Sequence, residues 1–225
     1  MDYLVCGKHT VISAYDSKRV KKIYIKNAKD AELFKGIKVE QKDKSFFKKK
    51  FENLNILHQG FAALVSPIKK YDVEYFFKKN DLKLIALQGI EDQRNIGSII
   101  RSCAAFNVDG LIIEKKNFNE SSLLMNKTHA GNIDHIKIII VTNLINLIKK
   151  IKKKNCFVYC LDQNSKTDIK NYDFNNKSLL IFGNESKGIK QYIVKECDAA
   201  LKIKINSNVE SLNLSNAVAV TLSHL

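Results

Sequence analysis

The sequence predicts an α/β fold with a mainly parallel sheet covered by helices on both faces. The prediction rests on residues 82–225, where short apolar runs alternate with amphipathic segments of helical period. Strands that are apolar along their whole length are typical of parallel sheets. The predicted strands are Leu84–Gln88, Gly110–Glu114, Ile136–Ile140, Phe157–Leu161, Leu179–Phe182 and Leu201–Ile205, and the predicted helices are Asn95–Phe106, Leu144–Lys153, Ile189–Lys195 and Leu212–Leu222.

The first third of the chain predicts a smaller α/β domain. Its expected elements are a helix at Lys8–Tyr15, a strand at Val20–Ile25, a basic helix at Lys42–Phe51, and strands near Leu54–Leu57 and at Phe61–Val65. Ser66-Pro67 interrupts the pattern, and the charged, aperiodic stretch after it predicts a linker between two domains. We therefore predict one domain over residues 1–68, a linker over 69–81 and a second domain over 82–225.

The formal net charge of +15 favours a polyanionic partner. The chain uses 35 lysines and only 3 arginines, a skew that codon bias alone can produce, so basicity is weak support for nucleic acid binding. Residues 1–80 carry 18 basic and 9 acidic side chains and are the more basic part. A lysine-rich helix exposed to solvent around residues 42–50 explains that excess equally well.

The sequence gives no indication of a membrane, a metal or an oxidising compartment. No basic segment followed by an apolar one opens the chain, and Ile136–Ile148, the most apolar stretch, is too short to span a bilayer. The five cysteines show no disulfide spacing, so we expect a reduced, cytoplasmic protein. Cys156 and Cys160 lack the second Cys/His pair that a four-ligand metal site needs, so we predict no metal.

Polar segments follow three of the predicted strands, where ligands of parallel α/β sheets bind. In the first segment, Asn95 can cap the helix that begins there, and Arg101 projects from its second turn. An arginine stands out in this lysine-rich chain because its planar fork holds a phosphate bidentately. Alternatively, Asn95 is only a cap and Arg101 a surface ion-pair partner.

The other two segments combine flexible backbone with clustered polar side chains. Gly183 and Gly188 flank a polar turn that opens a helix, where a ligand can approach the backbone closely. Ser211, Asn213 and Ser215 crowd the start of an apolar C-terminal helix that is suited to burial, including burial in a subunit interface. Taken singly, the two segments are equally compatible with an ordinary βα turn and an ordinary capping cluster.

In order and spacing, the three segments resemble motifs 1, 2 and 3 of the SpoU/TrmH group of SPOUT RNA methyltransferases. The matching residues are Asn95-Ile96-Gly97 with Arg101, Phe182–Gly188, and Ser211–Ser215. The resemblance covers residues 82–225 and includes Lys127–Gly131, similar to the family's middle segment. His129 stands where the family usually has serine and Lys204 where proline is common, so we expect looser loops there.

The front of the chain resembles the small substrate-binding domain of the same family. The similar stretches are Cys6–Val11, Arg19–Ile25 and His58–Val65. This pairing of domains is typical of bacterial enzymes that methylate a guanosine of large-subunit ribosomal RNA. The resemblance implies RNA-binding roles for Lys8, His9, Arg19, His58, Gln59 and Arg94.

The resemblance implies that the protein transfers a methyl group from S-adenosylmethionine to a ribose 2′-hydroxyl. The expected target is a guanosine of 23S ribosomal RNA. The resemblance also implies a C-terminal trefoil knot and a homodimer. The implied catalytic residues are Asn95, Arg101, Glu185, Ser211 and Asn213. The implied cofactor-binding residues are Phe182, Gly183, Asn184, Gly188, Ile203, Ile205 and Leu212.

Three other functions remain open on the sequence. A nicotinamide enzyme or a classical Rossmann methyltransferase needs a glycine-rich loop after its first strand, and only Gly89 and Gly97 occur there. A non-catalytic RNA-binding protein would keep the basic front domain but has no use for Arg101, Glu185 and Asn213 together. A methyltransferase acting on transfer RNA would keep the chemistry and change the substrate.

Overall fold

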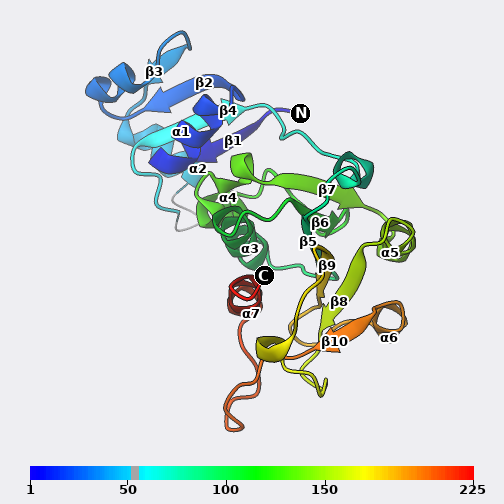
Figure 1. Ribbon diagram of the computed structural model, residues 1–225. Coiled ribbons are helices and arrows are strands. Elements are labelled where there is room, and N and C mark those ends of the chain that lie inside the picture. Colours follow the sequence, from blue (N-terminus) through cyan, green and yellow to red (C-terminus); the bar gives the residue numbers. More distant parts are fainter. Residues whose placement is uncertain (52–55) are drawn as a thin grey trace. The chain divides into compact units, whose positions relative to one another are not determined.

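The computed structural model describes residues 1–51 and 56–225 and forms two compact units (Figure 1). Unit 1 comprises residues 1–69 and 119–135, and unit 2 comprises residues 70–118 and 136–225. The segment 119–135 therefore packs with the front of the chain, whereas the sequence placed it in the second domain. The chain passes between the units three times, so each unit is described by itself.

Unit 2 is built on the predicted parallel sheet. Its strands are β5 (Leu82–Leu87), β6 (Gly110–Glu114), β7 (Lys137–Val141), β8 (Phe157–Leu161), β9 (Lys177–Phe182) and β10 (Ala199–Leu201). They are arranged in the order β10-β8-β9-β5-β6-β7, and every neighbouring pair is parallel. The mainly parallel α/β prediction is confirmed, although the last strand ends where the predicted one, Leu201–Ile205, was expected to begin.

Helices cover both faces of this sheet (Figure 1). They are α3 (Gln93–Ala105), α5 (Leu144–Lys152), α6 (Gln191–Val194) and α7 (Leu214–Leu222). Leu147 and Ile148 of α5 share a core cluster with Ile112 and Leu179 of the sheet, while α3 and α7 pack against each other. Because side chains alternate along a strand, Ile85 and Leu180 are buried under the opposite face, where α3 and α7 lie.

The segment expected to be a linker belongs to the core of unit 2. It contains a short 3-10 helix, η3 (Val73–Phe76), whose first and last residues are buried in the same cluster as α5. Lys70 forms an isolated parallel bridge with Ile138 at the edge of the sheet. A single turn with two buried side chains is too short to show periodicity, which is why the sequence suggested a linker here.

Unit 1 contains a four-stranded sheet in the order β1-β4-β2-β3. Its elements are β1 (Tyr3–Cys6), α1 (Lys8–Asp16), β2 (Val20–Ile25), η1 (Ala28–Leu33), β3 (Val39–Gln41), α2 (Lys44–Phe51), β4 (Phe61–Val65), α4 (Leu123–His129) and η4 (Asn132–His135). β4 pairs antiparallel with β1 and β2, and β3 is parallel to β2. The short strands β1 and β3 were not predicted. Of the strand expected near Leu54–Leu57, residues 54 and 55 lie outside the described part, and Ile56 and Leu57 form no strand.

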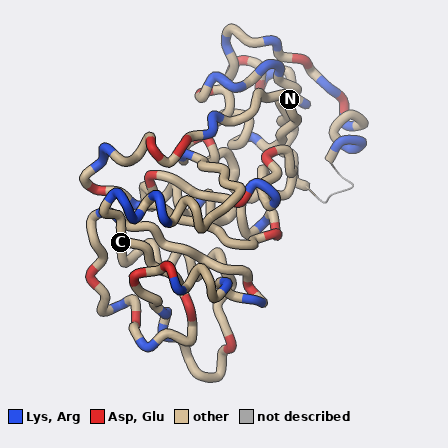
Figure 2. The backbone as a smooth tube through the Cα atoms, turned by 90° about the vertical axis from the view of Figure 1, so that its right-hand side faces the viewer, with Lys and Arg blue, Asp and Glu red and all other residues tan. Residues whose placement is uncertain are grey.

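Charge is distributed over the surfaces of both units. Lysines and arginines occur along helices and loops throughout the tube, with acidic residues interspersed among them (Figure 2). Net charge alone therefore does not single out one surface as the RNA path. Within residues 1–51 and 56–225, no helix is long and apolar enough to cross a membrane. Over the same residues, no group of three or more His, Cys, Asp or Glu side chains is placed to hold a metal ion.

Candidate active site

Three segments that follow strands of unit 2 meet through side-chain hydrogen bonds. Asn95 of α3, which follows β5, donates from Nδ2 to Oε1 of Glu185 at 2.5 Å, and Glu185 lies in the loop after β9. Asn213, at the start of α7, donates from Nδ2 to Oδ1 of Asn95 at 3.3 Å. These residues are 90 and 118 positions apart in the chain. The structure thus brings together three of the five predicted catalytic residues.

The cap of α3 is Asp92 and not Asn95, as the sequence suggested. The Asp92 side chain accepts a hydrogen bond from the backbone N–H of Arg94 at 2.7 Å, and the helix begins at Gln93. Asn95 consequently lies inside the first turn. Its side-chain amide is not used for capping and is available to bond with the two other segments.

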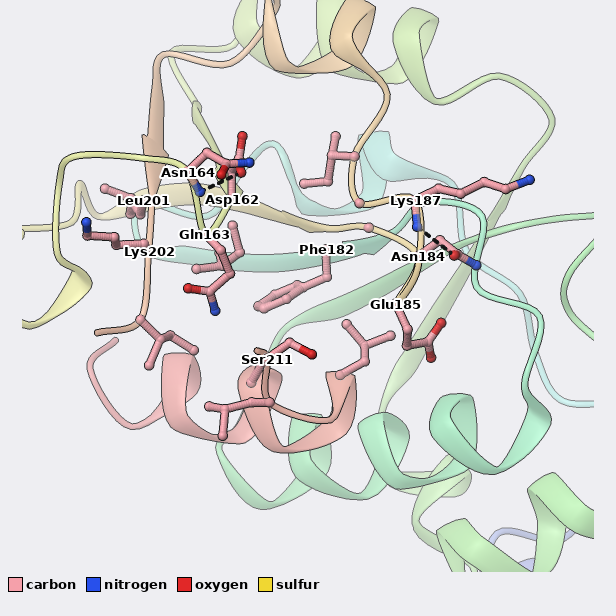
Figure 3. A pocket seen from close by; sticks show the side chains of 18 of the residues that line it. Asp162, Gln163, Asn164, Phe182, Asn184, Glu185, Lys187, Leu201, Lys202 and Ser211 are labelled. Atoms are coloured by element: carbon pink, nitrogen blue, oxygen red, sulfur yellow. Dashed lines mark hydrogen bonds between the residues drawn. The ribbon is translucent and has the colours of Figure 1, made fainter. Parts of the chain in front are cut away.

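A cavity of about 270 Å³ lies between the loops after β8 and β9, the segment after β10 and the start of α7 (Figure 3). Figure 3 shows Phe182 and Ser211 between the loop of Gln163 on one side and Glu185 on the other. The predicted site residues that line the cavity are Phe182, Gly183, Asn184, Glu185, Gly188, Ile203, Ser211 and Leu212. Ile205, predicted to bind the cofactor, does not line it.

The cavity wall after β9 depends on a glycine. A Cβ atom at Gly183 would lie 2.4 Å from the carbonyl carbon of Gly188, far inside van der Waals contact. Gly188 itself has φ +61°, and its N–H donates to the backbone oxygen of Asn184 at 2.8 Å. The turn from 184 to 188 therefore folds back onto Gly183 at a distance that no other residue type permits.

One polar wall of the cavity consists of residues that were not predicted from the sequence. Asp162, Gln163 and Asn164 follow β8 and line the cavity opposite Glu185. The Asp162 carboxylate accepts a hydrogen bond from the N–H of Asn164 at 2.9 Å, which holds this loop in a turn. The signal was present in the sequence, because Asp-Gln-Asn directly follows a buried strand, the position where ligands of parallel sheets bind.

Arg101 does not line the cavity of its own chain. It lies on the exposed face of α3, and within the described residues its guanidinium forms no hydrogen bond or ion pair. Arg101 comes six residues after Asn95, and six helical steps of about 100° turn the two side chains roughly 120° apart. Arg94 lies seven residues before Arg101 and therefore on nearly the same face of the helix. Two of the three arginines of the chain are thus exposed on the same face of α3, about two helical turns apart.

Arg19, predicted to contact RNA, is instead engaged inside unit 1. Its Nε and Nη2 bond to the Asp134 carboxylate at 2.5 and 3.1 Å, and Nη1 donates to the carbonyl of Ser66 at 2.7 Å. The side chains of Arg19 and Asp134 are only 11% and 2% exposed. Because its donors are satisfied by buried partners, we assign Arg19 a structural role and withdraw it from the RNA-binding residues.

The other predicted RNA-binding residues of unit 1 lie around the start of α1. Oε1 of Gln59 accepts from the backbone N–H of Lys8 at 3.1 Å, a bond that supports the first turn of the helix. Nδ1 of His58 accepts from Gly60 N–H at 3.0 Å, and its ring stacks on Phe47 at 4.7 Å between centroids. Lys8 and His9 are exposed. Gln59 is exposed too and His58 is half-buried, so an RNA contact in this region stays a prediction for all four residues.

His129 does not loosen its loop. The ring is fully buried, with Nδ1 accepting from Gly131 N–H at 3.0 Å and Nε2 at 3.0 Å from Oδ1 of Asn126. A ring whose Nδ1 accepts must carry its proton on Nε2, so the neutral imidazole satisfies both partners. Burial, with a smaller effect of the Arg19 charge, lowers the pKa of His129 to about 3. Lys204 lies exposed in the irregular segment after β10.

Comparison with known proteins agrees with this geometry. The SpoU rRNA Methylase family matches residues 83–223, and the family described as RNA 2′-O ribose methyltransferase substrate binding matches residues 4–71. A Staphylococcus aureus (strain COL) protein named for the TrmH family of tRNA/rRNA methyltransferases is 30% identical over 233 residues. That alignment spans 98% of this chain and 94% of that protein.

Solved structures share the fold over the whole chain. The AdoMet complex of the SpoU methyltransferase AviRb from Streptomyces viridochromogenes superposes with a TM-score of 0.86 at 20% identity, covering 99% of this chain and 88% of that one. AdoMet-bound rRNA methyltransferase from Sinorhizobium meliloti gives a TM-score of 0.85 at 21% identity, covering 99% and 86%. Together with the two family matches, which cover most of the chain, these findings show that the chain belongs to the SpoU/TrmH family of RNA methyltransferases.

Proposed function

We propose that this protein transfers a methyl group from S-adenosylmethionine to the 2′-hydroxyl of an RNA ribose, with a guanosine of 23S ribosomal RNA as its target. The observation that supports the proposal most strongly is the hydrogen-bonded set of Asn95, Glu185 and Asn213 beside the cavity after β9. A protein that only binds RNA has no need of a cavity flanked by such a set. The family matches support RNA as the substrate class.

The cavity suits the methyl donor. S-adenosylmethionine carries an ammonium, a carboxylate, a sulfonium and an apolar adenine face, and when bound it supplies an electrophilic methyl group. The lining offers charges of both signs, with Asp162 and Glu185 on one hand and Lys187 and Lys202 on the other. Apolar side chains, among them Leu212, complete the wall. The residues present therefore fit a zwitterionic, partly apolar ligand of this kind.

The residues of the chain would act mainly by positioning. A ribose hydroxyl is a poor nucleophile while it keeps its proton, so the site must align it and help remove that proton. A guanidinium is a poor base, but that of Arg101 can bind a phosphate and stabilise the developing negative charge on the 2′-oxygen. In this proposal the proton passes to an oxygen of the target phosphate, which Arg101 holds. Asn95, Glu185, Ser211 and Asn213 orient the nucleotide.

Arg101 reaches the reacting atoms in an assembly of two chains. Arg101 lies on the exposed face of α3 and not in its own cavity. Exposed apolar surface remains on α7, where Val220 is 37% exposed. We therefore propose a homodimer in which these helices contribute to the interface, and a trefoil knot in the C-terminal segment, both as the family resemblance implies. The expected place of action is the cytoplasm, where ribosomal RNA is found.

Methyl transfer in vitro and in cells tests the proposal. Purified protein with radiolabelled S-adenosylmethionine should label 23S ribosomal RNA, and mapping of ribose methylation in cells with and without the gene should show one guanosine that loses its methyl group. If only transfer RNA is labelled, the substrate is transfer RNA and not ribosomal RNA. Absence of S-adenosylmethionine binding would leave a non-catalytic RNA-binding protein.

A further inference from the structure

We propose that Asn184 is a positioning residue for methyl transfer, because its side chain connects the loop of residues 183–188 after β9, called the cofactor loop below, to the backbone that leads into α3. The inference rests on the proposed function, since it concerns how the two sides of the methyl-transfer site are held together. Asn184 lies next to Glu185 in the chain, and Gly89 lies three residues before the cap of α3. A bond between Asn184 and Gly89 therefore acts on the distance between Glu185 and Asn95.

The oxygen of the Asn184 side chain shapes the cofactor loop. Oδ1 accepts hydrogen bonds from the N–H of Ser186 at 3.0 Å, the hydroxyl of Ser186 at 2.8 Å and the N–H of Lys187 at 3.2 Å. These bonds fold the turn between Asn184 and Gly188, part of the cavity wall. An acceptor at this position is all that the turn itself requires.

The nitrogen of the same side chain has a different partner. Nδ2 of Asn184 donates to the carbonyl oxygen of Gly89 at 3.0 Å, across 95 positions of sequence. The orientation of the amide is fixed by chemistry, because only its oxygen can accept from backbone N–H groups and only its nitrogen can donate to a carbonyl. One side chain thus fixes the turn after β9 and the turn after β5 at the same time.

Gly89 is held through its other backbone group by Glu114, at the end of β6. Its N–H donates to Oε2 of Glu114 at 2.6 Å, and the Glu114 side chain is only 15% exposed. A hydrogen bond to a partly buried carboxylate is charge-assisted and stronger than a neutral one. The sheet order β9-β5-β6 explains the arrangement, because β5 lies between the strands that supply the two partners.

Three side-chain links join the segments after β5 and β9: Asn184 to Gly89, Asn95 to Glu185, and the Lys190 N–H to Oε1 of Gln88, which holds the chain beyond the turn of residues 184–188. The second is made between two side chains that each have rotatable bonds. Without the first link, the loop that carries Glu185 can shift relative to α3 while both segments stay folded. A displacement of about 1 Å in a positioned reaction costs on the order of 100-fold in rate.

The sharpest test is Asn184→Asp, which keeps the size of the side chain and separates its two functions. A carboxylate still accepts the three bonds of the turn but cannot donate to Gly89, and it places an anionic oxygen against that carbonyl. We expect the dissociation constant for S-adenosylmethionine to stay within about threefold, while kcat for RNA methylation falls by about 10-fold to 100-fold. The KM for RNA should change little.

A matched control and a second variant complete the test. Asn155→Asp makes the same charge change at an exposed residue in the turn between α5 and β8, and it should methylate as the wild type does. Glu114→Gln keeps an acceptor for the Gly89 N–H and should retain most of kcat, whereas Glu114→Ala should lose about as much as Asn184→Asp. If Asn184→Asp fails to fold, the Glu114 pair alone decides the outcome.

The outcomes separate this inference from the proposed function. A wild-type protein that methylates no RNA refutes the proposed function. An active wild type with Asn184→Asp or Glu114→Ala of equal kcat overturns the positioning role. Loss of S-adenosylmethionine binding in Asn184→Asp, in step with the loss of kcat, also overturns it, because Asn184 would then serve the cofactor loop alone.

Discussion

The side-chain amide of Asn95 links Asn213 to Glu185: its Oδ1 accepts a hydrogen bond from Asn213, and its Nδ2 donates one to Glu185. The series of hydrogen bonds ends at the Glu185 carboxylate, which accepts from Asn95 through Oε1 and belongs to a residue that lines the cavity. A carboxylate held by an amide donor on one oxygen can accept a hydrogen bond from a bound ligand on the other. The relationship makes Asn95 the residue on which the other two depend.

Asn95→Asp should therefore lower the rate of methylation strongly, although the two side chains are almost the same size. A carboxylate at position 95 can accept from Asn213 but cannot donate to Glu185, and the two carboxylates would repel each other. We expect kcat to fall by about 100-fold, within the range found for the loss of a positioned donor. Steady-state methylation assays measure the effect. A double variant with Glu185→Gln, which removes the repulsion, should recover part of the loss, and no recovery would argue against the direct contact.

Replacing Arg101 should abolish methyl transfer and leave cofactor binding intact. Its guanidinium has no bonding partner within the described part of the chain, so its removal costs little stability. Arg101→Lys should not restore activity, because an ammonium cannot hold a phosphate bidentately. Calorimetric binding of S-adenosylmethionine and a methylation assay on the same preparation separate the two effects. Turnover retained by Arg101→Ala would remove this residue from the mechanism.

Gly183→Ala should eliminate cofactor binding. The added methyl group would lie 2.4 Å from the backbone of Gly188, so the turn from 184 to 188 has to move away from β9. Gly36→Ala is a suitable comparison, because a Cβ there meets nothing within 4 Å although φ is +71°. We expect binding of S-adenosylmethionine to be lost in the first variant and kept in the second, with the affinity measured by calorimetry.

The Arg19–Asp134 pair should stabilise unit 1 strongly. Both side chains are buried, so Asp134→Ala leaves a guanidinium without its anion, and breaking such a pair typically costs about 3–5 kcal/mol. Glu40→Gln offers a contrast, since its ion pairs with Lys22, Lys38 and Lys42 are far less buried than the Arg19–Asp134 pair and should contribute less. Urea unfolding of the full chain measures both. A free energy of unfolding unchanged by Asp134→Ala would contradict the structural role of Arg19.

Acidification should destabilise the protein through His129. Its pKa is about 3 in the folded chain, because of burial first and the Arg19 charge second, against an ordinary value of 6.5. The unfolded chain therefore binds a proton between pH 6.5 and 3 that the folded chain excludes, and the free energy of unfolding falls as the pH falls through that window. His129→Gln can make both hydrogen bonds without titrating. Its stability should depend less on pH, and an unaltered pH profile would count against this assignment.

Much of the site could be predicted because its signals are local. Polar residues after buried strands identified Asn95, Glu185 and Asn213, and the same rule applied to residue 162 would have found the missing wall of the cavity. The direction in which Arg101 points was not predictable from motif order, because it depends on how α3 turns against the sheet. The link from Asn184 to Gly89 and the pairing of Arg19 with Asp134 were hidden for another reason: each joins residues about a hundred positions apart, and no periodicity reports such contacts.

The segment 119–135 has a consequence for how the protein can be divided. A fragment that stops at Lys69 would keep all four strands of the small sheet but leave behind Asp134, the anion on which Arg19 depends. It would also lose Gly131, which lies so close to Ser13 that even a methyl group would not fit between them. The reciprocal fragment, starting at residue 70, would carry α4 with its buried imidazole facing water. A fragment that corresponds to unit 1 therefore has to join residues 119–135 to residues 1–69, because no single cut in the chain separates the two units.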